Sequence, residues 1–195
     1  METKSIKPYS RKKKEFFVHK ARPKGTVVDT IVVHYTAGGS LSGAISTLET
    51  RGLGYHYLID FDGSVYKGAP YMSETYHAGS SYGPHEEAYG KSKTQYLYTK
   101  ENVKAGRVYK FLIGCSVNPY TVGISLVNTN LGVPATQAQL KSLESLISDL
   151  KTVLPLKWVT GHHQVSPNRK SDPKGMDLDA VAKHTGLVYW KFPRN

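Results

Sequence analysis

The feature that most constrains the fold is a largely β-branched run over residues 26–36, which carries His34 near its end. Such a run is typical of a strand buried in a sheet. Three small residues at positions 37–39 follow the run and end it, leaving space above the histidine. We therefore expect a buried strand that presents one polar, chemically useful side chain at its end.

Strand patterns recur along the chain. Asp62-Gly63 is a hairpin signal, so residues 55–60 and 64–67 are expected to pair as neighbouring strands. Two further strands are expected over residues 120–127 and 156–160.

Helical patterns alternate with these strands. Apolar residues repeat at helical spacing over residues 41–48, and Gly52 is the stop signal that follows. Thr136 and Gln139 form a capping box that begins a second helix, and residues 177–184 predict a short third one. This order predicts an α/β fold in which a central mixed β-sheet is flanked by helices in a single domain.

Composition limits the alternatives. The chain has 195 residues, of which 39% are hydrophobic, enough to bury one ordinary core. Cys115 is the only cysteine, so no internal disulfide can form. No run approaches the ~18 apolar residues of a membrane span. Residues 78–120 are rich in Gly, Ser, Tyr and Lys, and we expect them to be a loop-rich insertion in a domain over residues 26–195.

Positive charge is concentrated at the N-terminus. Residues 1–25 hold nine Lys and Arg against two Glu, a net charge of 9 − 2 = +7 out of +11 for the chain. A basic arm of this kind suits any polyanion, whether nucleic acid, an anionic membrane or a cell wall, and it is equally consistent with a solvated tail. The segment lacks the apolar stretch of a secretory signal, so we expect synthesis in the cytoplasm.

Two histidines and an aspartate are the candidate metal ligands. His34 and His162 each lie at the end of an apolar strand, and Asp172 lies in a proline-bounded loop. Strand ends at one edge of a sheet can bring two imidazoles together, and a loop carboxylate can complete the set. Two neutral nitrogens and one oxygen suit Zn²⁺ with its fourth position open. A single such histidine is more often a structural hydrogen-bonding group, and His163 is the rival ligand.

Six short motifs surround these residues, in the order His34–Gly38, Gly54–Ile59, Asp62-Gly63, Tyr76–Gly79, Val122–Leu126 and Gly161–Pro173. Their order resembles the zinc-dependent N-acetylmuramoyl-L-alanine amidase family. That family includes phage lysozyme-amidases, bacterial anhydro-muropeptide amidases and animal peptidoglycan recognition proteins. The resemblance covers residues 27–185.

The resemblance implies a role for each matching position. It implies that His34, His162 and Asp172 hold Zn²⁺. Lys170 and Tyr55 match catalytic positions. In amide hydrolysis, Lys170 would place a fixed positive charge beside the negatively charged oxygen of the tetrahedral intermediate. Tyr55 would orient the attacking water or donate a hydrogen bond to the same oxygen.

Substrate contacts are implied at two further positions, His77 and Arg169. Ser125 stands where some members have a glutamate that serves as acid and base, so the group that protonates the leaving amine stays open. Within the insertion, several tyrosines are available to stack on sugars, namely Tyr82, Tyr89, Tyr96 and Tyr98. The remaining histidines are expected to be structural or at the surface, namely His56, His19, His85 and His184.

The implied function is hydrolysis of the amide between N-acetylmuramic acid and L-alanine in peptidoglycan, for bacterial wall lysis as by a phage endolysin. The alternative is a non-catalytic peptidoglycan-binding module of the same fold. A nucleic-acid-binding protein would leave the histidines, Lys170 and Asp172 unexplained, so no nucleic acid partner is expected. We expect a monomer that is made in the host cytoplasm and acts on the wall after release, with the basic arm contacting an anionic wall or membrane.

Overall fold

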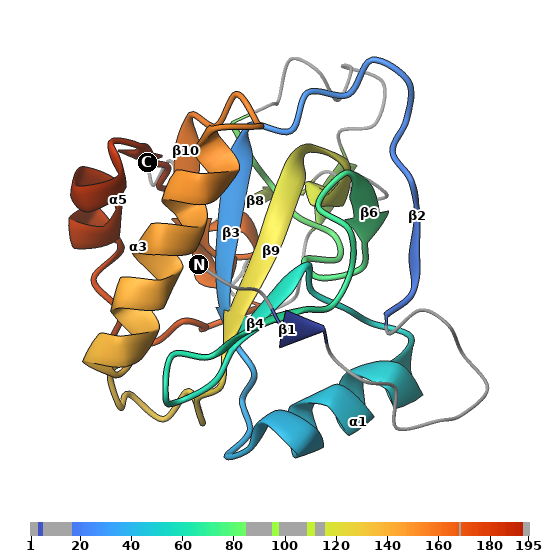
Figure 1. Ribbon diagram of the computed structural model, residues 1–195. Helices are drawn as coiled ribbons and strands as arrows, with labels where there is room; N and C mark the ends of the chain where they lie inside the picture. Colours follow the sequence, from blue (N-terminus) through green and yellow to red (C-terminus); the bar gives the residue numbers. More distant parts are fainter. Residues whose placement is uncertain are drawn as a thin grey trace.

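The computed structural model describes residues 4–5, 17–84, 95–97, 109–111, 116–167 and 169–192. At its centre lies a mixed β-sheet with the strand order β1-β5-β4-β9-β3-β10-β11 (Figure 1). Its strands are β1 (Lys4–Ser5), β3 (Thr30–Tyr35), β4 (Tyr57–Ile59), β5 (Val65–Lys67), β9 (Thr121–Leu126), β10 (Trp158–Gly161) and β11 (Val188–Tyr189). The predicted α/β fold with a central mixed sheet is confirmed.

The middle of the sheet is parallel. Strand β3 lies between β9 and β10 and runs parallel to both, whereas β4 and β5 form the antiparallel hairpin expected around Gly63. Every residue of β3 and β9 is buried. Parallel strands covered on both faces need apolar runs of this kind, which explains the β-branched stretch that dominates the sequence.

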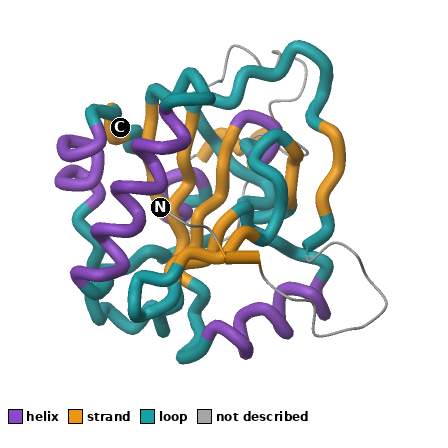
Figure 2. Tube along the Cα trace, in the orientation of Figure 1, coloured by secondary structure: helices purple, strands orange, loops and turns teal. Residues whose placement is uncertain are grey.

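Helices cover both faces of the sheet (Figures 1 and 2). On one face, α3 (Gln137–Lys151) and α5 (Leu178–Thr185) pack on Ile31 and Val33 of β3. On the other, α1 (Leu41–Arg51) packs on Leu58 of β4. Because side chains alternate along a strand, His34 points to the face opposite α3.

The helix ends follow the local signals. Thr136 and Gln139 form the predicted capping box at the start of α3, with both reciprocal hydrogen bonds present. Helix α1 ends at Gly52, which adopts the left-handed conformation with φ of 62° that favours glycine. The Asp177 side chain caps α5 by accepting a hydrogen bond from the backbone nitrogen of Ala180.

Residues 17–25 of the N-terminal segment pack on the domain. Strand β2 (His19–Ala21) pairs with β6 (Ser73–Thr75), and Phe17 is only 2% exposed. The guanidinium of Arg22 donates to the backbone carbonyls of Tyr71, Asn118, Pro119 and Thr121. The last third of the basic segment is therefore part of the folded structure.

The expected insertion contains regular structure. Strands β7 (Gln95–Leu97) and β8 (Tyr109–Phe111) pair antiparallel, and a short 3-10 helix, η2 (Asn118–Tyr120), leads into β9. The expectation that Tyr82 is free to stack on sugars is wrong, because its ring is 2% exposed and packs against Phe192. Tyr89, Tyr98, His85 and Cys115 lie outside the described residues, as does the side chain of Tyr96. Within the described part of the chain, no helix has the length and apolar character needed to cross a membrane.

Candidate metal centre

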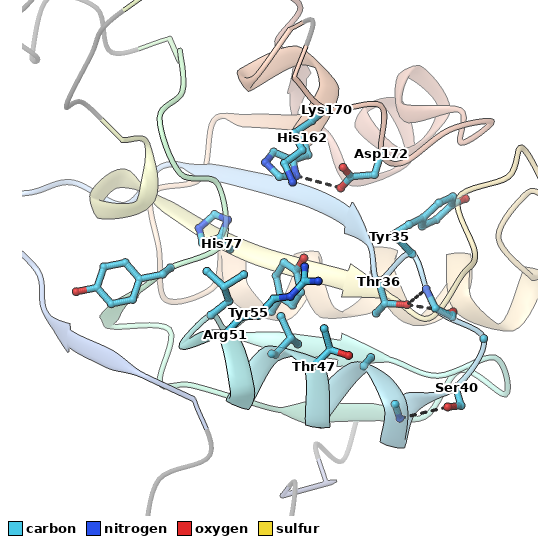
Figure 3. A pocket seen from close by; sticks show the side chains of 18 residues that line it. Tyr35, Thr36, Ser40, Thr47, Arg51, Tyr55, His77, His162, Lys170 and Asp172 are labelled. Carbon is cyan, nitrogen blue, oxygen red and sulfur yellow. Dashed lines mark hydrogen bonds and ion pairs between the residues drawn. The ribbon is translucent and has the colours of Figure 1, made fainter.

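Three potential ligands converge on the face of the sheet opposite α3. One ligand atom from each of His34, His162 and Asp172 lies within 4.8 Å of the others, and all three residues are buried. The Asp172 Oδ2 atom is 3.3 Å from Nδ1 of His34 and 3.1 Å from Nδ1 of His162. Figure 3 shows the contact with His162. The structure therefore brings together the three residues that the sequence indicated.

Strand register explains how the two histidines meet. Strand β10 lies parallel to β3 with Gly161 opposite Val33, so the next residue along each strand places His162 beside His34. The two ring centroids are 4.4 Å apart. His162 is the first residue of a short helix, α4 (His162–Val165), rather than the last residue of the strand.

Asp172 is held in place by the neighbouring histidine. Its backbone carbonyl accepts hydrogen bonds from the backbone nitrogen of His163 at 2.8 Å and from the His163 ring at Nδ1 at 3.1 Å. The His163 ring is not among the three potential ligands. A Cβ atom at Gly161 would lie 2.6 Å from that ring, so this position needs glycine.

The hydrogen bonds around the centre favour a cation. Nε2 of His162 lies 3.2 Å from the carbonyl of Ala78, and because a carbonyl only accepts, this nitrogen carries the proton. In the neutral His162 ring, Nδ1 is then unprotonated, and its lone pair faces Asp172 Oδ2. Nδ1 of His34 is also buried and has no hydrogen-bond partner. Acceptor atoms that face one another with no proton between them fit a shared metal ion, and this donor set suits Zn²⁺.

The protonation states suit a metal as well. Burial by itself would raise the pKa of Asp172, but the adjacent imidazoles of His162 and His34 outweigh it and hold the pKa well below its usual range. Burial, followed by the nearby His162, lowers the pKa of His34 to about 4. At neutral pH the centre thus offers a carboxylate and a neutral His34, which are the forms that bind metals.

His77 lies directly behind His34. Its Nδ1 is 3.1 Å from Nε2 of His34, and its Nε2 is 3.0 Å from the hydroxyl of Thr121. Burial, then the neighbouring His34, His56 and His162, hold the pKa of His77 well below the usual value. The ring packs on Gly123, where a Cβ atom would lie 2.6 Å from it.

A cavity of about 530 Å³ is lined by two of the three potential ligands, His162 and Asp172. It runs from His162 and Asp172 to α1 (Figure 3). Tyr55 and Lys170, the two predicted catalytic residues, both line it, as does His77. The remaining lining residues belong mainly to the segment after β3, to α1 and to the residues that follow it, namely Tyr35–Ser40, Gly43, Ala44, Thr47, Leu48, Arg51, Leu53 and Tyr76.

Tyr55 and Lys170 differ in character. The Tyr55 ring lies 4.8 Å from the His34 ring, centroid to centroid. Burial raises the pKa of Tyr55, and the negative charge of Asp172 adds to the effect, so the phenol remains a hydrogen-bond donor. Lys170 is exposed at the cavity mouth, and its backbone nitrogen donates to the carbonyl of Ser166.

Arg169 makes a set of local contacts. Its guanidinium donates to the carbonyls of Ala78 and Ser80 at 2.6 and 3.0 Å and to the hydroxyl of Ser166 at 2.7 Å. These bonds tie the loop after β6 to the loop that carries Asp172. They also orient the Ala78 carbonyl that meets His162.

The remaining described histidines lie away from the potential ligands. His56 is fully buried and accepts from the backbone nitrogen of Gly123, as expected for a structural residue. His184 is exposed and forms an ion pair with Glu144, and His19 is partly buried.

Two residues that position the site were not singled out from the sequence. Thr121 contacts Nε2 of His77, and Gly123 leaves the space in which the His77 ring packs. Gly123 lies within the motif Val122–Leu126. A glycine inside an otherwise β-branched strand is the signal that could have indicated a close approach there.

The comparisons with known proteins agree with this geometry. A family model described as N-acetylmuramoyl-L-alanine amidase matches residues 24–175. No curated protein matches the chain.

Solved structures of related architecture cover nearly the whole chain. LysCS, an endolysin N-acetylmuramoyl-L-alanine amidase from Clostridium intestinale URNW, is 18% identical with a TM-score of 0.62, covering 96% of this chain and 97% of its own. AmpD from Citrobacter freundii is 20% identical with a TM-score of 0.56, covering 95% and 91%. Peptidoglycan recognition protein-LE, solved with tracheal cytotoxin, is 13% identical with a TM-score of 0.56, covering 95% of both chains. At these identities the likeness establishes the fold.

Proposed function

Because the chain belongs to the N-acetylmuramoyl-L-alanine amidase family, we propose that it is a zinc-dependent hydrolase that cleaves the amide between N-acetylmuramic acid and L-alanine in peptidoglycan. The observation that carries the proposal is the convergence of His34, His162 and Asp172 beside a cavity. Their outer hydrogen bonds point unprotonated atoms at one another, which suits a metal at the place where a substrate can enter.

The proposed residues divide the work of amide hydrolysis. An amide resists attack because its carbonyl is a poor electrophile and water is a poor nucleophile. Held by His34, His162 and Asp172, Zn²⁺ would polarise the carbonyl and activate water. The protein itself must orient the substrate, stabilise the negative charge that develops on the carbonyl oxygen and deliver a proton to the leaving amine.

Lys170 and Tyr55 are the groups that we assign to the developing charge. The ammonium of Lys170 stands at the cavity mouth two residues from Asp172, so the loop that holds the ligand also holds the charge. Tyr55 remains protonated and can donate a hydrogen bond to the same oxygen. Fixed donors of this kind stabilise a tetrahedral intermediate more than they stabilise the substrate.

Ser125 lies on the same face of the sheet as His34, paired with it across the β3–β9 ladder, and is fully buried. A serine hydroxyl does not ionise near neutral pH, so it does not replace a glutamate as general base. We therefore propose that proton delivery to the amine would fall to Tyr55, to water that bound zinc would activate, or to another group, rather than to a carboxylate on β9.

A non-catalytic binding module is the second candidate, supported by the fold-level likeness to peptidoglycan recognition protein-LE. The two candidates differ in the metal ligands and Lys170, which a binding module does not need. All four are in place here, and this favours the enzyme. For substrate contacts, we propose the cavity residues, His77 among them, and Arg169, which lies outside the cavity lining on the loop that carries Asp172.

We further propose a lytic role, in which the protein is made in the cytoplasm of a host bacterium and meets the wall after release, as a phage endolysin does. The likeness to the LysCS endolysin amidase and the +7 charge of residues 1–25 support it. Intracellular production should leave cells intact until the membrane is permeabilised and should then lyse them. Cells that stay intact after permeabilisation would contradict the lytic role.

The decisive experiment for the activity is product analysis of digested sacculi. The proposal predicts free stem peptides with a new L-alanine amino terminus and intact glycan chains, and no release after zinc is removed with a chelator. New reducing sugar ends would identify a glycosidase. Binding to sacculi without any release, at full zinc occupancy, would identify the binding module.

A further inference from the structure

The geometry points to a relay of hydrogen bonds from Val117 through Thr121 and His77 that fixes which ring nitrogen of His34 faces the metal centre. His77 and Thr121 are then positioning residues for a metal ligand. This inference rests on the proposed zinc site, but the protons of the relay can be observed without any metal or substrate.

The relay begins at a carbonyl, where the direction of the hydrogen bond is unambiguous. The Thr121 hydroxyl lies 2.9 Å from the Val117 carbonyl oxygen. A carbonyl has no proton to give, so the hydroxyl must donate there. Its single proton is then used, and the Thr121 oxygen can only accept from its other buried neighbour.

That neighbour is Nε2 of His77, 3.0 Å from the Thr121 oxygen. Since Thr121 accepts, Nε2 of His77 must carry a proton. His77 is 7% exposed and has His34 and His56 as ring neighbours, so a second, charge-bearing proton would be costly. In the neutral ring Nδ1 is a lone pair.

The lone pair of His77 in turn sets His34. Nδ1 of His77 is 3.1 Å from Nε2 of His34, so Nε2 of His34 donates to it. The remaining nitrogen of His34, Nδ1, is then unprotonated and lies 3.3 Å from Asp172 Oδ2. Four groups in series thereby leave the metal-facing atom of His34 free to bind.

The same reasoning applies to His162, where a single hydrogen bond sets the tautomer. His162 donates from Nε2 to the carbonyl of Ala78, so a carbonyl sets its tautomer directly. His34 is buried in the middle of the sheet, and its acceptor is a histidine ring instead. An imidazole nitrogen can accept or donate, so the hydrogen bond between His77 and His34 could run either way. Thr121 fixes its direction by fixing which nitrogen of His77 carries the proton, and this role goes beyond packing.

The test compares Thr121→Val, which removes the hydroxyl at nearly constant volume, with Thr121→Ser, which keeps it. Thr30→Val is the matched control, since Thr30 is also fully buried, lies on the strand of His34 and uses its hydroxyl on Asp29 instead. The first readout is the tautomer of His77 from ¹⁵N chemical shifts of the labelled rings, before and after Zn²⁺ is added. The second is Zn²⁺ affinity from competition with a chelator.

We expect wild type, Thr121→Ser and Thr30→Val to hold the His77 proton on Nε2, with and without zinc. Thr121→Val should lose that preference and bind Zn²⁺ about 10–100-fold more weakly, the usual effect of removing an outer partner of a ligand. A wild-type His77 proton on Nδ1 would overturn the relay, and this measurement needs no variant. So would a Thr121→Val protein that binds zinc as tightly as Thr30→Val. A chain that shows the expected His77 tautomer but binds no zinc would instead refute the proposed zinc site.

Discussion

His163 holds the backbone of Asp172 through two hydrogen bonds to one carbonyl, while the neighbouring His162 faces the Asp172 side chain. Adjacent histidines thus serve one aspartate in different ways, one by fixing its loop and the other by sharing its carboxylate. Their contributions to metal binding should therefore be separable.

His162→Ala should abolish stoichiometric zinc binding and activity, because it removes one of three ligand atoms. His163→Ala should still bind one zinc ion per chain but with lower affinity, because only the loop of Asp172 is loosened. Elemental analysis of both purified variants checks this. If His162→Ala keeps full zinc and His163→Ala loses it, the ligand assignment is reversed.

Lys170→Ala should leave zinc bound and lower turnover on muropeptides by ~10²–10³, the typical effect of losing one oxyanion donor. The ammonium is not a ligand, so the loss falls on the chemical step. Lys174→Ala is the matched control, an exposed lysine on the same loop that is absent from the cavity lining. Turnover near the wild-type value with zinc in place would remove Lys170 from the mechanism and leave Tyr55 as the remaining donor.

Gly123→Ala should disturb the metal centre by displacing His77, which contacts His34. The added Cβ would lie 2.6 Å from Cγ and 2.7 Å from Nδ1 of His77, so the ring must shift, and its contact with His34 shifts with it. Overpacking of this kind costs ~1–3 kcal/mol of unfolding free energy, and zinc affinity should fall with it. Gly39→Ala is the control for stability, since its Cβ would meet nothing within 4 Å. Denaturant unfolding and chelator competition measure the two effects.

Much of this fold could be predicted because its signals are local. The β-branched run around His34, the capping box at Thr136 and the hairpin at Gly63 each depend on a few adjacent residues, and all three appear where they were expected. The convergence of His34 with His162 followed from one further rule, that ends of parallel strands meet at one edge of a sheet.

The outer contacts of the site could not be predicted in this way. The bond between His34 and His77 joins residues 43 positions apart, and that between His77 and Thr121 joins residues 44 apart. No periodicity encodes such pairs, since they depend on how a loop folds back over the sheet. The burial of Tyr82 was missed for the same reason, because its partner Phe192 lies near the C-terminus, far from Tyr82 in the sequence.

His56 should make the stability of the fold sensitive to acid. Its Nδ1 accepts from the backbone nitrogen of Gly123, and burial lowers its pKa to about 3. Between pH 6.5 and about 3, His56 is protonated in the unfolded chain but not in the folded chain. The contribution of neutral His56 to stability is therefore full above pH 6.5 and is lost as the pH falls. One proton corresponds to ~1.4 kcal/mol per pH unit. Denaturant unfolding across this range should show a slope smaller by about one proton in His56→Gln, and an unchanged slope would exclude His56 as the source.

The basic segment should act on adsorption and leave the chemical step alone. Truncation at residue 24 would be a poor test, because it removes the buried Phe17 and the Arg22 guanidinium that holds four backbone carbonyls. Replacing Arg11, Lys12, Lys13 and Lys14 by glutamine removes four charges from the densest basic run and keeps residues 17–25. Turnover on small soluble muropeptides should stay at the wild-type value, since the cavity residues are unchanged.

On whole sacculi the same variant should bind more weakly, and the difference should shrink as salt is added, because charge attraction is screened over about 10 Å at 0.1 M. Cosedimentation with sacculi at low and high ionic strength measures this, with the Lys170→Ala protein as the reciprocal control that should adsorb normally and turn over slowly. Equal adsorption of the glutamine variant and wild type at low salt would show that this run is a solvated tail with no part in wall binding.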